Sequence, residues 1–110
     1  MSKDFDTSRL SGKSKTLANS IVKWMTERAG EAPDGGGCRA FYSPKEWRER
    51  GEDYGLTSEL ILVHDGGDLA PYCNLDYEEY KMHDALYEFL KSKGYYLESC
   101  TCWYSAVYKL

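Results

Sequence analysis

Apolar residues recur at helical spacing in two long stretches of the chain, about Ser14–Ala29 and Asn74–Lys93. Gly30 and Gly94 follow these stretches, at the position where glycine commonly ends a helix. The pattern therefore predicts two long amphipathic helices. The apolar face of the first contains Leu17, Ile21, Trp24, Met25 and the stem of Arg28. The face of the second contains Leu75, Met82, Leu86, Phe89 and Leu90, with His83 at its border.

Other apolar runs are short and have the composition of strands. The continuous aliphatic run at 60–63 predicts a strand in the middle of a sheet. The turn residues at 65–68 follow it, and 69–73 is expected to return antiparallel, with Pro71 limiting that strand to a sheet edge. Residues 38–42 predict a short strand, and the Tyr-rich segment 95–110 predicts one or two more.

A third, short helix is predicted after residue 43. Ser43 is placed to cap it, Pro44 suits the first helical position, and Glu46 completes a capping box. Gly51 ends the helix within two turns, and the glycine-rich stretch 31–37 reads as a loop.

These elements predict an α+β fold in one domain spanning residues 1–110, with residues 1–10 flexible. We expect a small, mostly antiparallel sheet of about four strands. Two main helices and one short helix are expected to pack on one face of that sheet.

Composition also indicates the cellular compartment and the oxidation state of the four cysteines. The sequence contains neither a run of apolar residues long enough to span a bilayer nor the apolar segment of a signal peptide. We therefore expect a cytoplasmic protein with reduced, mostly buried thiols. We also expect no cofactor.

Charge is distributed unevenly along the chain. The net formal charge is −4, but residues 1–50 carry +3 and residues 51–110 carry −7. Between Glu52 and Glu88 there are ten acidic residues and one base, Lys81. This block disfavours direct binding to nucleic acid and favours a basic protein surface as the partner.

The second long helix carries a candidate partner-binding surface. Projected at 100° per residue, tyrosines and carboxylates interleave beside its apolar face. The candidate residues are Asp76, Tyr77, Glu79, Tyr80, Asp84 and Tyr87. Such a surface would suit an arginine-rich partner, through ring contacts and ion pairs. The alternative is that the tyrosines widen the core face and the acids form a solvated helix surface.

Catalytic chemistry has one candidate segment. His64, Asp65 and Asp68 follow the predicted central strand and combine an imidazole with two carboxylates, as a metal site or a hydrolase would require. Residues 65–68 are also of the types that commonly form turns, and we favour the interpretation that this segment is a turn. A zinc site built from His64, Cys73, Cys100 and Cys102 lacks the spacing of known zinc motifs, and no nucleophile elbow or P-loop is present.

In its small size, acidity and tyrosine content, and in the acidic block at 52–88, the chain resembles accessory proteins of phages and mobile elements, including anti-CRISPR proteins. The resemblance implies an inhibitor that covers a nucleic-acid-binding surface. Our first hypothesis is therefore a non-enzymatic inhibitor or adaptor that docks on a basic, nucleic-acid-handling protein. Alternatives are a small metal-dependent or hydrolytic enzyme at residues 64–68, and a self-associating structural protein, a homodimer for instance, that uses the Tyr-rich C-terminal segment as an open sheet edge.

Overall fold

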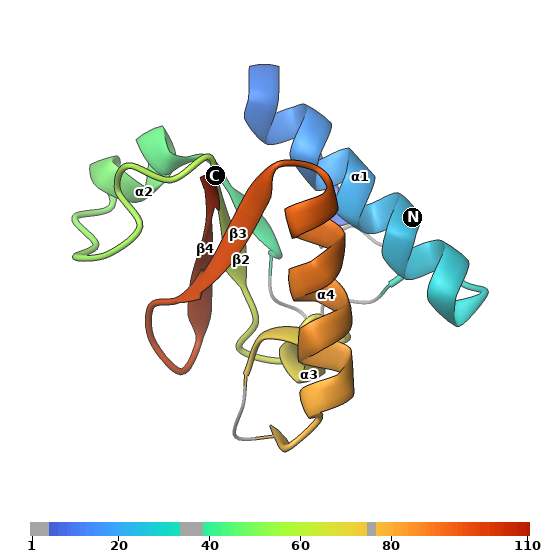
Figure 1. Ribbon diagram of the computed structural model, residues 1–110. Coiled ribbons are helices and arrows are strands. Elements are labelled where there is room, and N and C mark those ends of the chain that lie inside the picture. The colour runs from blue at the N-terminus through green and yellow to red at the C-terminus, as the bar shows by residue number, and fades with distance from the viewer. Residues whose placement is uncertain (1–4, 34–38, 75–76) are drawn as a thin grey trace.

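A four-stranded antiparallel sheet forms the centre of the protein in a computed structural model that describes residues 5–33, 39–74 and 77–110 (Figure 1). The strand order is β1-β2-β4-β3, and each pair of neighbours is antiparallel. The strands are β1 (Phe41–Tyr42), β2 (Leu60–Val63), β3 (Tyr95–Ser99) and β4 (Tyr104–Lys109). The predicted α+β class and the central position of β2 are confirmed, and the predicted start of the first strand at Cys38 lies outside the described residues.

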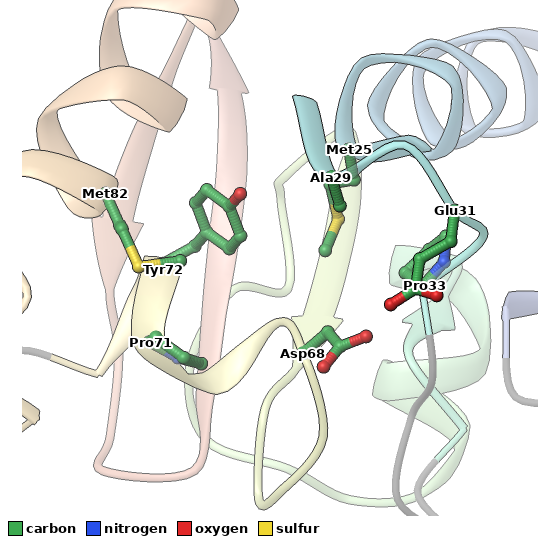
Figure 2. A pocket seen from close by; sticks show the side chains of 8 residues that line it. All are labelled: Met25, Ala29, Glu31, Pro33, Asp68, Pro71, Tyr72 and Met82. Atoms are coloured by element: carbon green, nitrogen blue, oxygen red, sulfur yellow. The ribbon is translucent and has the colours of Figure 1, made fainter. Parts of the chain in front are cut away.

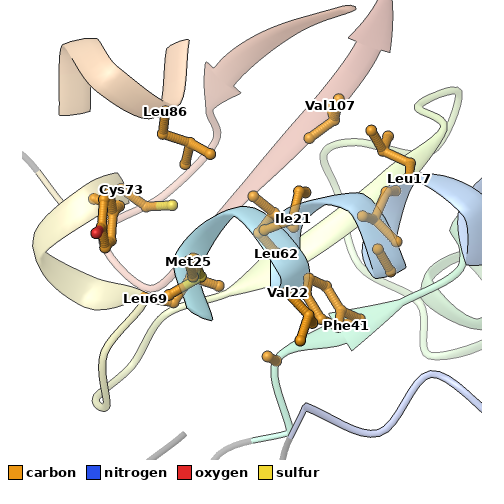
Figure 3. Packing of buried hydrophobic residues seen from close by; sticks show 14 of the residues in the cluster. Leu17, Ile21, Val22, Met25, Phe41, Leu62, Leu69, Cys73, Leu86 and Val107 are labelled. Atoms are coloured by element: carbon orange, nitrogen blue, oxygen red, sulfur yellow. The ribbon is translucent and has the colours of Figure 1, made fainter. Parts of the chain in front are cut away.

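Two long helices pack on one face of the sheet, α1 (Gly12–Ala29) and α4 (Tyr80–Ser92). Their buried faces meet alternate residues of β2 and β4, such as Leu62 and Val107 (Figure 3). The rings of Trp24 on α1 and Phe89 on α4 stack with centroids 4.9 Å apart, which joins the two helices directly. Helix α1 ends as predicted, with Gly30 in the left-handed conformation (φ 77°).

The short helix α2 (Pro44–Glu49) lies against the opposite face of the sheet, so the prediction that all helices share one face is wrong. Its Trp47 is fully buried and packs in a second cluster with the other alternate residues of β2 and β4. Because all four residues of β2 are buried, both faces of this strand need cover. A continuous aliphatic run indicates a strand that is buried on both faces, and α2 covers the second face of β2.

Local sequence explains why α2 forms in so few residues. The Ser43 hydroxyl accepts a hydrogen bond from the backbone N–H of Glu46 (3.1 Å), and the Glu46 carboxylate accepts one from the N–H of Ser43 (3.0 Å). This is the predicted capping box, with Pro44 at the start of the helix. Glu46 also forms ion pairs with Arg9 and Arg39, which ties the helix to distant parts of the chain.

Two predictions between β2 and α4 are wrong. Residues 69–73 do not return as a strand, because Pro71 lies in the first turn of a short helix, α3 (Ala70–Cys73). The second long helix begins at Tyr80 instead of Asn74. Glu78 has a positive φ of 58° and Glu79 is the non-helical N-cap residue, so helical backbone is interrupted just before Tyr80.

Among the described residues, no helix combines the length and apolar character needed to cross a membrane.

Candidate partner-binding surface

Two tyrosines and three carboxylates lie exposed where the chain enters α4. Tyr77 and Tyr80 are 51% and 58% exposed, which places them among the most exposed large hydrophobic side chains of the described residues. The carboxylates belong to Glu78, Glu79 and Asp84, all of which are exposed. We call these five residues the α4 entry surface.

The structure separates the predicted stripe into two parts. Tyr80, Asp84 and Tyr87 are on the helix, but Tyr77 lies before it, so the projection of Tyr77 at 100° per residue does not apply. Tyr87 is half-buried and packs against the main hydrophobic cluster. This agrees with the alternative interpretation, in which the tyrosines widen the apolar face of the helix. Asp76 lies outside the described residues.

The exposed carboxylates have few interactions with other described residues. The Asp84 side chain is 79% exposed, and one of its oxygens lies 3.9 Å from Nδ1 of His83, too far for a hydrogen bond. Glu78 and Glu79 precede the first turn of α4, where negative charge interacts favourably with the helix dipole. That interaction gives these acids a structural role without burying them. They therefore remain accessible to a partner.

Sequence reasoning did not select Glu78. Its positive φ turns the chain immediately before α4. Such a conformation is uncommon for glutamate and has no clear signal in the sequence, because Asn, Asp and Gly are the residues that usually adopt it.

A pocket of about 190 Å³ lies between the end of α1, α3 and the start of α4 (Figure 2). Figure 2 shows Met82, Tyr72 and Pro71 on one side and Met25, Ala29, Glu31 and Pro33 on the other, with Asp68 between them. Its walls are mostly apolar, and Glu31 and Asp68 supply the carboxylates. Met82 lies between Tyr80 and Asp84 in the sequence, so the pocket adjoins the helix that carries the entry surface.

The candidate catalytic residues at 64–68 are divided between the interior and the surface of the protein. His64 is 1% exposed, and its Nε2 lies 3.0 Å from the Ser105 hydroxyl, inside the protein. Burial lowers the pKa of His64 to about 4, so the ring is neutral at pH 7. Asp65 and Asp68 are exposed instead. Residues 64–69 connect β2 to α3, and the Gly67 carbonyl accepts a hydrogen bond from the Ala70 N–H.

The candidate zinc ligands are also dispersed. Cys73 is buried, Cys100 is half-buried and Cys102 is exposed, and all three are free thiols. Burial and the nearby Glu98 carboxylate raise the pKa of Cys100 to about 11, and burial also raises the pKa of Cys73. Within the described ranges, no three His, Cys, Asp or Glu side chains are placed to hold a metal ion.

Comparison with known proteins gave no match to a protein-family model, a curated protein or a solved structure.

Proposed function

We propose that this protein is an inhibitor or adaptor that binds a basic protein surface through the α4 entry surface. The observation that carries the proposal is the exposure of Tyr77 and Tyr80 beside accessible carboxylates. Tyrosine offers a large, rigid contact area and is enriched at protein interfaces. Its ring also attracts an arginine guanidinium, while a neighbouring carboxylate can accept two hydrogen bonds from the same group.

Charge supports a basic partner over a nucleic acid. The net charge of residues 51–110 is −7, and the exposed charged residues of the segment 77–84 are three acids and one base, Lys81. A surface of this sign would repel phosphates but would accelerate association with lysine- and arginine-rich proteins. Proteins that handle nucleic acids present such surfaces. A phage-encoded counter-defence role, in which the entry surface covers a nucleic-acid-binding site, is the specific form of the proposal.

Affinity capture with charge-reversed variants tests the surface. The wild-type protein and a Glu79→Lys/Asp84→Lys variant are used to capture proteins from bacterial lysate at low and high salt, with identification by mass spectrometry. A Glu49→Lys/Asp53→Lys variant is the matched control, because it makes the same change in net charge at exposed positions elsewhere. The captured protein is then purified and its dissociation constant measured for each form.

We expect the wild type and the control to bind the purified partner, with affinity that falls as salt rises. The Glu79→Lys/Asp84→Lys variant should bind at least tenfold more weakly, because it replaces two attractive contacts by repulsive ones. A Tyr77→Ala/Tyr80→Ala variant should also bind weakly, with an unchanged net charge. Equal affinities for all four forms would refute the entry surface as the binding site.

A further inference from the structure

The outer edge of β3 has backbone hydrogen-bonding groups that no described residue pairs with. The N–H of Leu110 donates to the carbonyl of Gly94 (2.9 Å), and the N–H of Cys100 donates to the carbonyl of Tyr104 (3.3 Å). Hydrogen-bonded positions alternate along an antiparallel pair of strands. The backbone N–H and C=O groups of Tyr96 and Glu98 therefore also point toward β4. The N–H and C=O groups of the alternate residues therefore point away from the sheet. These residues are Tyr95, Leu97 and Ser99.

Of the features that usually protect an exposed strand, this edge has only one charged side chain, Glu98. β3 pairs with β4 in continuous register over five residues, without a bulge, and contains neither proline nor lysine. The opposite edge of the sheet differs, because β1 is only two residues long. A regular edge with so little protection is a template for another strand.

We propose that β3 pairs antiparallel with β3 of a second copy, around a two-fold axis at Leu97, to form one continuous sheet across a homodimer. This register pairs Leu97 with its own copy and Tyr95 with Ser99 of the second copy through backbone hydrogen bonds. Tyr96 then stands directly opposite Glu98 of the second copy, with the two side chains close together. The proposal is independent of the α4 entry surface.

The side chains of β3 favour a second copy of this chain as the occupant. In the two-fold register the single charge of the strand, Glu98, meets Tyr96 and never another Glu98. The Tyr96 ring is already held in place, stacked on Tyr108 with centroids 5.4 Å apart. Pairing of the two β3 edges therefore places no two like charges opposite each other. The net charge of −4 on each copy adds a weak repulsion that salt screens.

Charge substitutions at the two facing positions test this register. Tyr96→Glu places two carboxylates opposite each other at two symmetric points of the dimer, and like charges directly opposite destabilise a strand pair. Adding Glu98→Lys to that variant restores opposite charges at the same points. Tyr96→Gln is the matched control, because it removes the ring and its stacking on Tyr108 without adding charge. Circular dichroism verifies that each variant is folded.

Sedimentation equilibrium, at concentrations up to ~1 mM and near-physiological salt, measures the mass of each form. We expect the wild type, Tyr96→Gln and Tyr96→Glu/Glu98→Lys to approach twice the 12.6 kDa mass of one chain. Tyr96→Glu alone should weaken the dimer at least tenfold. A wild type that is monomeric throughout this range would overturn the proposal. So would a dimer that Tyr96→Glu leaves unchanged, which would mean that the copies associate elsewhere.

Discussion

A histidine beside carboxylates in the sequence can be either a reactive group or a packed one, and burial decides between them. His64 follows β2 and points into the protein, with its Nε2 beside the Ser105 hydroxyl on the neighbouring strand. Its backbone N–H donates to the carbonyl of Trp103 (2.9 Å), which extends the pairing of β2 and β4 by one residue. The ring is therefore part of the core, and its titration affects the stability of the fold.

Stability should fall in mild acid because His64 is buried in its neutral form. The pKa of His64 is about 4 in the folded protein, against an ordinary value of 6.5 in the unfolded chain. The unfolded chain thus binds a proton first as the pH decreases. The contribution of His64 is complete above pH 6.5 and is lost as the pH falls from 6.5 to 4, by roughly 3 kcal/mol.

Urea unfolding at pH 7, 5 and 4 measures this loss. A His64→Gln variant should start with lower stability at pH 7 and lack the His64 component of the decrease below pH 6.5. If the variant and the wild type lose the same free energy of unfolding between pH 7 and pH 4, other groups control the acid sensitivity.

At the scale of the elements, predictions succeeded where short-range sequence chemistry specifies the backbone. The capping box of α2, the glycine that ends α1 and the aliphatic run of β2 each act within a few residues, and each is confirmed. The predicted start of the second long helix at Asn74 was wrong because Leu75 continues the helical spacing of the apolar residues in the sequence, while Glu78 adopts a positive φ. The strand predicted at 69–73 was wrong because the apolar pattern of a short segment does not distinguish a strand from one helical turn.

The candidate site was only partly predictable for a related reason. Exposure of Tyr80 and burial of Tyr87 depend on which neighbours cover the helix, and those neighbours come from distant parts of the sequence. The net charge of the acidic block, in contrast, depends only on composition and could be predicted without knowledge of the fold. The pocket beside Met82 lies between three helices, of which α1 is distant in the sequence from the other two, so no short stretch of sequence predicts it.

The two serines at helix starts allow a matched test of capping. Ser43 caps α2 with its side chain, whereas Ser11 occupies the N-cap position of α1 without a side-chain hydrogen bond to the helix. Ser43→Ala should therefore lower the free energy of unfolding by about 1 kcal/mol, and Ser11→Ala by much less. Urea denaturation of both variants measures the difference. Equal losses would contradict a specific role for the capping box.

At the scale of the whole molecule, the sheet joins two unequal hydrophobic clusters. The larger lies under α1 and α4, and the smaller lies under α2, around Trp47. Neighbouring residues of one strand belong to different clusters: Leu62 contributes to the larger, and Ile61 and Val63 to the smaller. Neither cluster can be lost without disturbing the strands that the other requires.

This shared sheet predicts that the two faces unfold together. Trp24 packs against the larger cluster, whereas Trp47 and Trp103 belong to the smaller one or pack against it. In a Trp24→Phe variant, tryptophan fluorescence therefore reports only the α2 face. Far-ultraviolet circular dichroism is dominated by the long helices on the other face. Phenylalanine keeps an aromatic ring next to Phe89, so we expect the variant to fold.

Urea titration of this variant, followed by both signals, should give one midpoint and one slope, as for a two-state domain. The physical reason is that β2 is buried on both sides and hydrogen-bonds both β1 and β4, so opening the α2 face exposes apolar residues of the strand at the centre of the sheet. A fluorescence transition at lower urea than the loss of helix would show that the α2 face opens separately. In that case, the shared strands would not couple the two clusters strongly enough to make them a single cooperative unit.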